Sequence, residues 1–208
     1  IAQYHNLADE TVDSVIRVID TEYSDLVNFE ISSINAQRAL MKNVGRGVLS
    51  MVESFYARTG TGGIDEAAAR KECLERLEAF RFQDDQGFFV FDANLAGLSH
   101  PVRRMVGKNW FEYESIQKAG PTRLIRKIKK NKSHTFAVLM WPVEGKQKLV
   151  KHLALFMYYP EWEWIIGTAY PIDAIEQKST RKEAGILTKL DKIIGQLSIN
   201  SIGGVLIL

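Results

Sequence analysis

Cysteine is almost absent from this chain, and long apolar runs are absent altogether. Its 208 residues include one cysteine, Cys73, so no disulfide can form within the chain. No stretch of about eighteen consecutive apolar residues occurs, which excludes a complete membrane-spanning helix within these residues. The net charge is only +2, from 27 basic and 25 acidic residues, and gives no reason to expect nucleic acid as a partner.

Catalytic and metal-binding motifs are missing as well. The chain has no H-E-x-x-H zinc motif, no G-x-S-x-G nucleophile turn, no phosphate loop and no G-x-G-x-x-G that follows a strand. Its four histidines lie far apart and follow no metal-ligand spacing. The turn DANLAG at 92–97 resembles half of a calcium loop, but Arg103 stands where that loop requires a bidentate glutamate. We therefore expect no enzyme, no cofactor and no metal site.

Helical periodicity dominates both ends of the chain. Apolar residues recur at helical spacing over residues 11–55 without a proline, which predicts one long N-terminal helix. The stretch TGTGG ends it, and residues 64–80 predict a second helix with Asp65 as its N-cap. Cys73 shares the face of that helix that carries Leu77, so we expect a core residue and not a nucleophile. Residues 171–199 predict a C-terminal helix.

Between these helices the periodicity becomes that of strands. Apolar runs bounded by turn residues predict five strands, at residues 87–91, 97–100, 134–141, 149–159 and 162–170. Most connections are too short for parallel crossovers, so we expect an antiparallel sheet and an α+β fold. An insertion over 102–133 contains a basic helix. We expect its charges to face solvent, with an anion-facing or membrane-facing patch as the alternative.

Several segments, taken in order, resemble the single Cache (sCache) domains of bacterial chemoreceptors and sensor kinases. They are Phe80-Arg81-Phe82 at the end of the second helix, DDQGFFVFDANLAGLSHP, MVGKNW, MWP and YYPEWEWIIGTAYPIDAI. The resemblance covers about residues 34 to 176. It implies a PAS-like, five-stranded antiparallel sheet with the long N-terminal helix packed on one face. A ligand is then expected on the other face, under the insertion.

The resemblance also implies a function and a location. It implies the extracytoplasmic (periplasmic) ligand-sensing domain of a transmembrane receptor, which binds a small organic acid, an amino acid or a similar metabolite. Leu139 stands where the family usually has a tyrosine, and His152 and Leu155 stand where Lys-x-x-Tyr is expected. The loss of these polar groups favours a larger or more apolar ligand. It also keeps open the alternative of a structural or interaction module with a vestigial pocket.

We predict a pocket formed by aromatic and histidine side chains. Alternation along the first strand directs Phe89 and Phe91 into it, although a register shift of one residue exchanges them for Phe88 and Val90. His100 is expected to donate a hydrogen bond to an anionic ligand group, and its alternative is a strand-end histidine satisfied by the backbone. The other predicted pocket residues are Trp110, Trp141 and His152.

Arg81 is the best candidate to meet a ligand carboxylate, because a guanidinium offers two parallel donors. The alternative is a salt bridge to an aspartate at position 84, 85 or 92.

The two ends of the chain suggest how this domain is attached. We expect residues 1–33 to be the membrane-proximal part of the long helix, 34–176 the sensor domain, and 177–208 a helix that leads towards a transmembrane segment. The apolar ending SIGGVLIL fits the first turns of such a segment, and a short terminal strand is the alternative. An apolar stripe on the first helix suits a homodimer, through Val12, Ile16, Ile19 and Tyr23.

Overall fold

The computed structural model describes residues 2–60, 63–109, 121–130, 134–141 and 149–203. The chain divides into two compact units, one of residues 36–173 and one formed by residues 1–35 together with 174–208. Helix α1 (Ala2–Ala57) contributes to both units, and α5 (Asp173–Gly203) follows directly on the last strand. The long helices predicted at the two ends of the chain are thus confirmed, and α1 starts nine residues earlier than its periodicity indicates.

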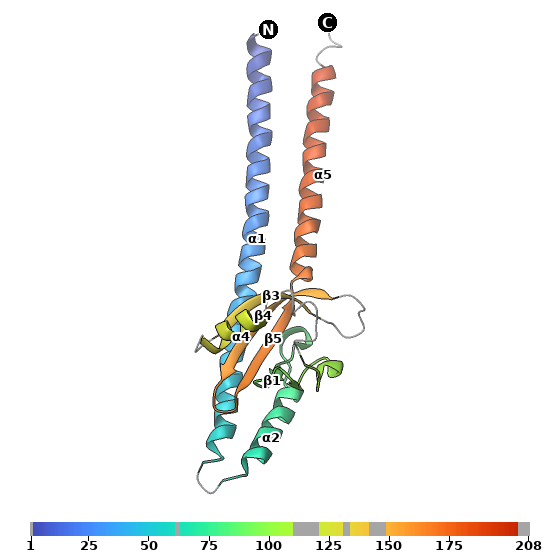
Figure 1. Ribbon diagram of the computed structural model, residues 1–208. Helices are drawn as coiled ribbons and strands as arrows, with labels where there is room; N and C mark the ends of the chain where they lie inside the picture. Colours follow the sequence, from blue (N-terminus) through green and yellow to red (C-terminus); the bar gives the residue numbers. More distant parts are fainter. Residues whose placement is uncertain (1, 61–62, 110–120, 131–133, 142–148, 204–208) are drawn as a thin grey trace. The chain divides into compact units, whose positions relative to one another are not determined.

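In the unit of residues 1–35 and 174–208, α1 and α5 run antiparallel (Figure 1). The Lys189 ammonium lies 2.6 Å from a carboxylate oxygen of Glu22, and the Lys182 ammonium lies 4.0 Å from the ring centroid of Phe29. A later residue of α1 meets an earlier residue of α5, so the start of α1 and the end of α5 lie at the same end of this unit. Several large apolar side chains of this unit are exposed: Val12, Ile16, Ile19, Tyr23, Ile31, Leu187 and Ile194.

The unit of residues 36–173 is built on a five-stranded antiparallel sheet with the order β2-β1-β5-β4-β3 (Figure 1). The strands are β1 (Phe89–Phe91), β2 (Gly97–Ser99), β3 (Thr135–Trp141), β4 (Val150–Tyr159) and β5 (Trp164–Pro171). The predicted α+β fold is confirmed. The first two strands are shorter than predicted, because the turn between them is closed by Asp92, which accepts hydrogen bonds from the N–H groups of Asn94 and Ala96.

One face of the sheet packs against α1 and against α2 (Glu66–Ala79). Met41, Val48 and Val52 form a buried stripe of α1 at helical spacing, and Gly45 lies in the same stripe. A Cβ at Gly45 would lie 2.9 Å from the Met157 sulfur, so this glycine lets α1 approach β4 closely. Cys73 of α2 is fully buried, and burial raises the pKa of its thiol to about 12, which confirms a core residue.

The other face of the sheet carries the main hydrophobic core cluster. Phe89 and Phe91 of β1 belong to it, together with Ile128 of α4 (Pro121–Lys130) and Met105 of the short helix η2 (Arg103–Met105). Phe88 points to the opposite face, where its ring packs on Phe80 and Phe82, so β1 has the predicted register. The basic side chains of α4 are exposed while Ile128 is buried, which confirms the solvent-facing interpretation of the basic helix.

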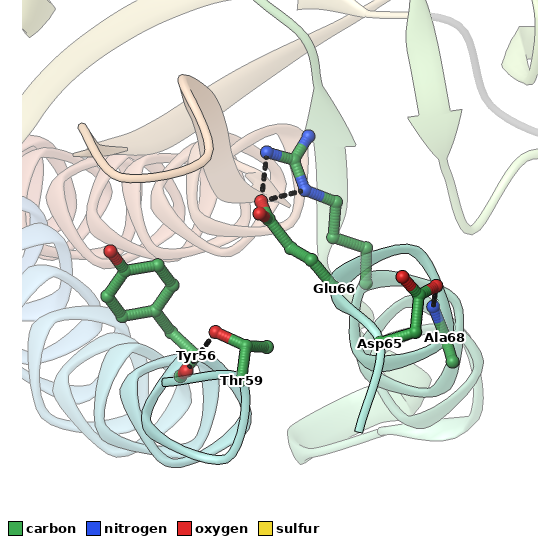
Figure 2. Close-up of polar contacts among 6 residues, drawn as sticks. Tyr56, Thr59, Asp65, Glu66 and Ala68 are labelled. Atoms are coloured by element: carbon green, nitrogen blue, oxygen red, sulfur yellow. Dashed lines mark hydrogen bonds and ion pairs between the residues drawn. The ribbon is translucent and has the colours of Figure 1, made fainter. Parts of the chain in front are cut away.

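The link between α1 and α2 is ordered by local hydrogen bonds, shown in Figure 2. The Thr59 hydroxyl donates to the Tyr56 carbonyl at 2.7 Å at the end of α1. Asp65 caps α2 by accepting the Ala68 N–H at 3.2 Å, and Glu66 pairs with Arg70 at 2.7 Å. The predicted N-cap is therefore confirmed.

No helix in the described part of the chain is long and apolar enough to cross a membrane. Helix α5 continues to Gly203, and the last residues of the apolar ending, 204–208, lie outside the described residues.

Candidate ligand-binding site

A cavity of about 190 Å³ lies against the core-cluster face of the sheet. Phe89 contributes from β1, Trp141 from β3, His152 from β4, and Ala169 from β5. The loop after β2 closes one side. The full set of described lining residues is Asp85, Gln86, Gly87, Phe89, His100, Pro101, Val102, Trp141, Val150, His152, Ala169 and Pro171. Strands distant in the sequence thus place their side chains around one space.

His100 is the most unusual polar group of this lining. Its side chain is 3% exposed, and Nδ1 accepts a hydrogen bond from the Val102 N–H at 2.9 Å. Because Nδ1 accepts, the proton of the neutral ring sits on Nε2. That Nε2 is buried and has no hydrogen-bond partner. Burial also lowers the pKa of His100 to about 4, so the ring is neutral at physiological pH.

Unpaired buried polar atoms are rare, and each calls for an explanation. In the described residues four such side-chain atoms occur: Gln37 Nε2, Ser99 Oγ, His100 Nε2 and Trp162 Nε1. Of these four residues, His100 is the one that borders the cavity. An N–H donor without a partner beside an enclosed space is the arrangement of a ligand-binding group.

Three rings hold this donor in place. The His100 ring lies 5.8 Å from Phe89 and 5.6 Å from Trp141, at interplanar angles of 16° and 17°. The Phe89 and Trp141 centroids are 5.1 Å apart. The cluster therefore gives the cavity a flat aromatic wall, suited to stacking on a planar group.

His152 is the second histidine of the lining and is held in the opposite tautomer. Its Nδ1 lies 2.8 Å from the Val150 carbonyl oxygen. A carbonyl can only accept, so Nδ1 carries the proton and donates it. In the neutral ring Nε2 is then an acceptor. The two histidines therefore present opposite hydrogen-bonding characters on their Nε2 atoms.

Arg81 does not border this cavity. Its guanidinium donates hydrogen bonds to the backbone carbonyls of Glu78 and Phe80, the latter at 2.8 Å, and Nε lies 3.6 Å from Asp85. It borders a second, more open cavity of about 370 Å³, which shares His100 and Pro101 with the first. The structure thus places Arg81 one wall away from the predicted pocket, with the predicted aspartate alternative formed through Asp85.

Four of the predicted pocket residues meet at one cavity: Phe89, His100, Trp141 and His152. Phe91 lies in the core cluster behind them, with its ring 5.3 Å from Phe89. Trp110 lies outside the described residues. That these side chains bind a ligand stays a prediction.

One statement about the pocket is wrong. Leu155 faces α1, where its side chain would contact a Cβ at Gly45, so its lack of a hydroxyl does not change the cavity. Residues 152 and 155 are three apart on a strand and point to opposite faces. Leu139 lies on the cavity side within the core cluster, although it does not line the cavity.

Several lining residues were not identified from the sequence: Asp85, Gln86, Gly87, Pro101, Val102, Val150, Ala169 and Pro171. Ala169 and Pro171 follow from alternation along β5 once the register with β4 is known. The backbone around residues 85–87 carries no periodic signal, so its place at the cavity could not be derived.

Metal ligands do not gather here or elsewhere in the described parts of the chain, where no group of three or more His, Cys, Asp or Glu side chains could hold an ion. The lining is suited to an organic ligand.

The antiparallel sheet, with a helix layer on one face and a ligand-sized cavity on the other, defines a PAS-like sensor fold. The sequence model of the family Single Cache domain 2 matches residues 33–184. This chain belongs to that family.

Two curated relatives match across most of the chain. The methyl-accepting chemotaxis protein CtpM of Pseudomonas aeruginosa is 26% identical over 177 residues, which are 82% of this chain and 30% of the relative. The sensor histidine kinase MctS of Rhizobium johnstonii is 21% identical over 184 residues, 86% of this chain and 38% of the relative. The chain therefore spans about a third of the length of these relatives.

Solved structures share the fold. A periplasmic sensor domain of a chemotaxis protein superposes with a TM-score of 0.61 at 23% identity, and covers 67% of this chain and 97% of its own. A Cache chemosensory domain described for carboxylic acid recognition gives 0.61 at 16% identity, over 68% of this chain and 97% of its own. A methyl-accepting chemotaxis protein of Vibrio parahaemolyticus gives 0.61 at 22% identity, over 73% and 99%.

Proposed function

We propose that this chain is the extracytoplasmic ligand-sensing domain of a transmembrane bacterial receptor, either a chemoreceptor or a sensor kinase. Its ligand is a small organic acid or a similar metabolite, and the domain is not an enzyme. Family membership and the names of the two relatives support the receptor assignment. The observation that carries ligand binding is the buried, unpartnered Nε2–H of His100 beside the cavity.

The connectivity of the chain supplies a route for the signal. Ala169 and Pro171 of β5 border the cavity, and α5 begins two residues after Pro171. A ligand that binds one arrangement of β5 more tightly than another shifts the population of both arrangements. That difference passes along the chain directly into α5. In the receptor, α1 and α5 would connect to membrane helices, and the exposed stripe at Val12, Ile16 and Ile19 would pair two copies.

A thermal-shift screen tests ligand binding. The set contains two- to six-carbon carboxylic acids, amino acids and their amides, each at millimolar concentration. A ligand at a hundred times its dissociation constant adds about 2.7 kcal/mol to the free energy of unfolding, which gives a clear rise in melting temperature. We expect at least one such rise in the unaltered protein.

The matched variants are His100→Phe and His134→Phe. His134 is half-buried and packs on Phe136, and it does not line the cavity, so its replacement controls for the loss of a histidine. We expect the shift to vanish in His100→Phe and to persist in His134→Phe. A domain that responds to no compound of the set is the interaction module with a vestigial pocket.

A further inference from the structure

The cavity offers a hydrogen-bond donor without offering a positive charge. In the described part of its lining there is no lysine and no arginine, and the one formally charged side chain is the carboxylate of Asp85. Gln86 is the neutral amide of the lining. An anionic ligand group placed here would meet a neutral N–H and a carboxylate, and no cation from these residues.

The nearest guanidinium is already engaged. Arg81 donates to the Glu78 and Phe80 carbonyls and pairs with Asp85, and its side chain borders the second cavity, not the first. Moving it to a ligand would leave the two carbonyls and Asp85 without this partner. The second cavity also contains Glu75 and Glu78, which oppose an anion there.

His100 is poorly able to supply the missing charge. Its Nδ1 is occupied as an acceptor by the Val102 N–H, so a second ring proton would require that contact to break. Burial among Phe89 and Trp141 also disfavours the charged ring, and its pKa is lowered to about 4. The titratable and charged groups around the two cavities are His152, Asp85, Arg81, Arg103, Glu75 and Glu78.

The size and shape of the cavity describe the body of the ligand. Its volume is about 190 Å³. A buried apolar cavity of roughly 150 Å³ is large enough to hold benzene. The flat wall formed by Phe89, His100 and Trp141 favours a planar ring over a short aliphatic chain.

We propose, building on the ligand-sensing function above, that this cavity selects a planar ring compound of about the size of benzene that carries a neutral oxygen acceptor, such as an aromatic carboxamide, over the carboxylate of the same shape. The acceptor oxygen takes the Nε2–H of His100, and the ring lies on the aromatic wall. A carboxylate would lose its hydration and gain one neutral donor, which leaves its charge without compensation from the described lining.

Two pairs of matched compounds test this preference by titration calorimetry at pH 7: benzamide with benzoate, and nicotinamide with nicotinate. Within each pair the molecules have nearly the same shape and differ in charge. We expect the amide to bind at least about tenfold more tightly than the acid. We also expect the amide affinity to change little between pH 6 and 8, because no proton is taken up on binding.

Three variants link the preference to His100. His100→Phe keeps the ring and removes the donor, so amide binding should fall by roughly tenfold or more. His100→Gln keeps a neutral N–H donor, and it should retain part of the amide preference even if the phenylalanine variant folds poorly. His134→Phe should bind as the unaltered protein does.

Each other outcome overturns the proposal in a distinguishable way. Carboxylates that bind as tightly as the amides, with affinity rising as the pH falls, would show that His100 takes up a proton to meet an anion. Binding of short acids or amino acids without either pair would reject the ring ligand. In both cases the sensing function stands. Amide binding that is unchanged in His100→Phe rejects the assigned donor, and a protein that binds no compound in any screen loses the sensing function as well.

Discussion

At the scale of single residues, His100 shows how backbone geometry sets the character of a titratable group. The Val102 N–H occupies Nδ1, which places the proton on Nε2, and the surrounding rings leave Nε2 without a partner. A neutral buried donor of this kind costs stability in the empty protein and is repaid when an acceptor arrives. This cost makes His100 measurable before any ligand is identified.

The pH dependence of stability follows from the lowered pKa of His100. Between about pH 6.5 and pH 4 the unfolded chain binds a proton that the folded His100 refuses. The free energy of unfolding should therefore be unaffected by this group above pH 6.5 and fall by about 3 kcal/mol as the pH is lowered to 4. Urea unfolding at pH 7 and pH 4.5 measures the change.

The control for this experiment is His100→Phe. The pKa of His134 is also lowered, by burial and by Lys42 and Arg46, so the unaltered protein contains a further contribution of the same sign. The difference between the two proteins isolates His100, and we expect the variant to lose less stability on acidification by about 2 kcal/mol or more. An equal loss in both proteins would mean that His100 is protonated normally in the folded state.

Sequence reasoning reached part of the candidate site for identifiable reasons. Alternation along a strand placed Phe89, and the ends of apolar runs placed His100 and Trp141, at positions that now border the cavity. The position of Arg81 could not be derived in this way. Its guanidinium folds back onto the carbonyls of its own helix end, which depends on backbone geometry that residue types do not encode.

At the scale of elements, the close approach of β1, β4 and β5 depends on one glycine. Gly167 stands opposite Phe89 in the β1–β5 pair and opposite Phe156 in the β4–β5 pair. A Cβ at this position would lie 2.5–2.6 Å from two carbons of the Phe89 ring and closer still to the Leu155 carbonyl oxygen. The ring of Phe89 covers the space where a side chain would be, and it also borders the cavity.

Gly167→Ala should therefore disturb both the sheet and the site. We expect a loss of about 1–3 kcal/mol in the free energy of unfolding, because neither the backbone carbonyl nor the buried ring can give way easily. The matched control is Gly47→Ala on α1, where a Cβ meets nothing within 4 Å and the helix should gain up to about 1 kcal/mol. Urea unfolding of the two variants decides; equal stabilities would show that the strands relax freely at Gly167.

The elements themselves were largely readable from periodicity. The helices, the N-cap at Asp65 and the five antiparallel strands follow from spacing of 3.6 and 2 and from turn residues. The order β2-β1-β5-β4-β3 does not, because the pairing of β1 with β5 joins segments about 75 residues apart in the sequence. In this chain that order came from the family resemblance, and the packing of Gly45 and Gly167 shows what makes it physically close.

At the scale of the whole molecule, the two units differ in what holds them together. The sheet unit has a buried core on both of its faces. The contacts printed between α1 and α5 in the other unit are an ion pair between partly exposed side chains and one cation–π contact. Surface ion pairs contribute at most about 1 kcal/mol. The pairing of these helix segments is thus the weaker of the two arrangements, which suits elements that must shift when a ligand binds.

This difference predicts that the sheet unit folds on its own and keeps its site. Every described residue that lines the cavity lies between positions 85 and 171, inside residues 36–173. A fragment of residues 36–173 should unfold cooperatively in urea, and its His100 ring should titrate near pH 4 by NMR, as in the 208-residue chain. The His100 titration needs no ligand, because it reports the burial and the Val102 contact that form the site. A second fragment, residues 33–184, follows the family boundaries and keeps the start of α5, so it separates damage at the cut ends from a real dependence on the helices. If His100 titrates near 6.5 in both fragments, the site requires the long helices, and the sensor must be treated as one cooperative body.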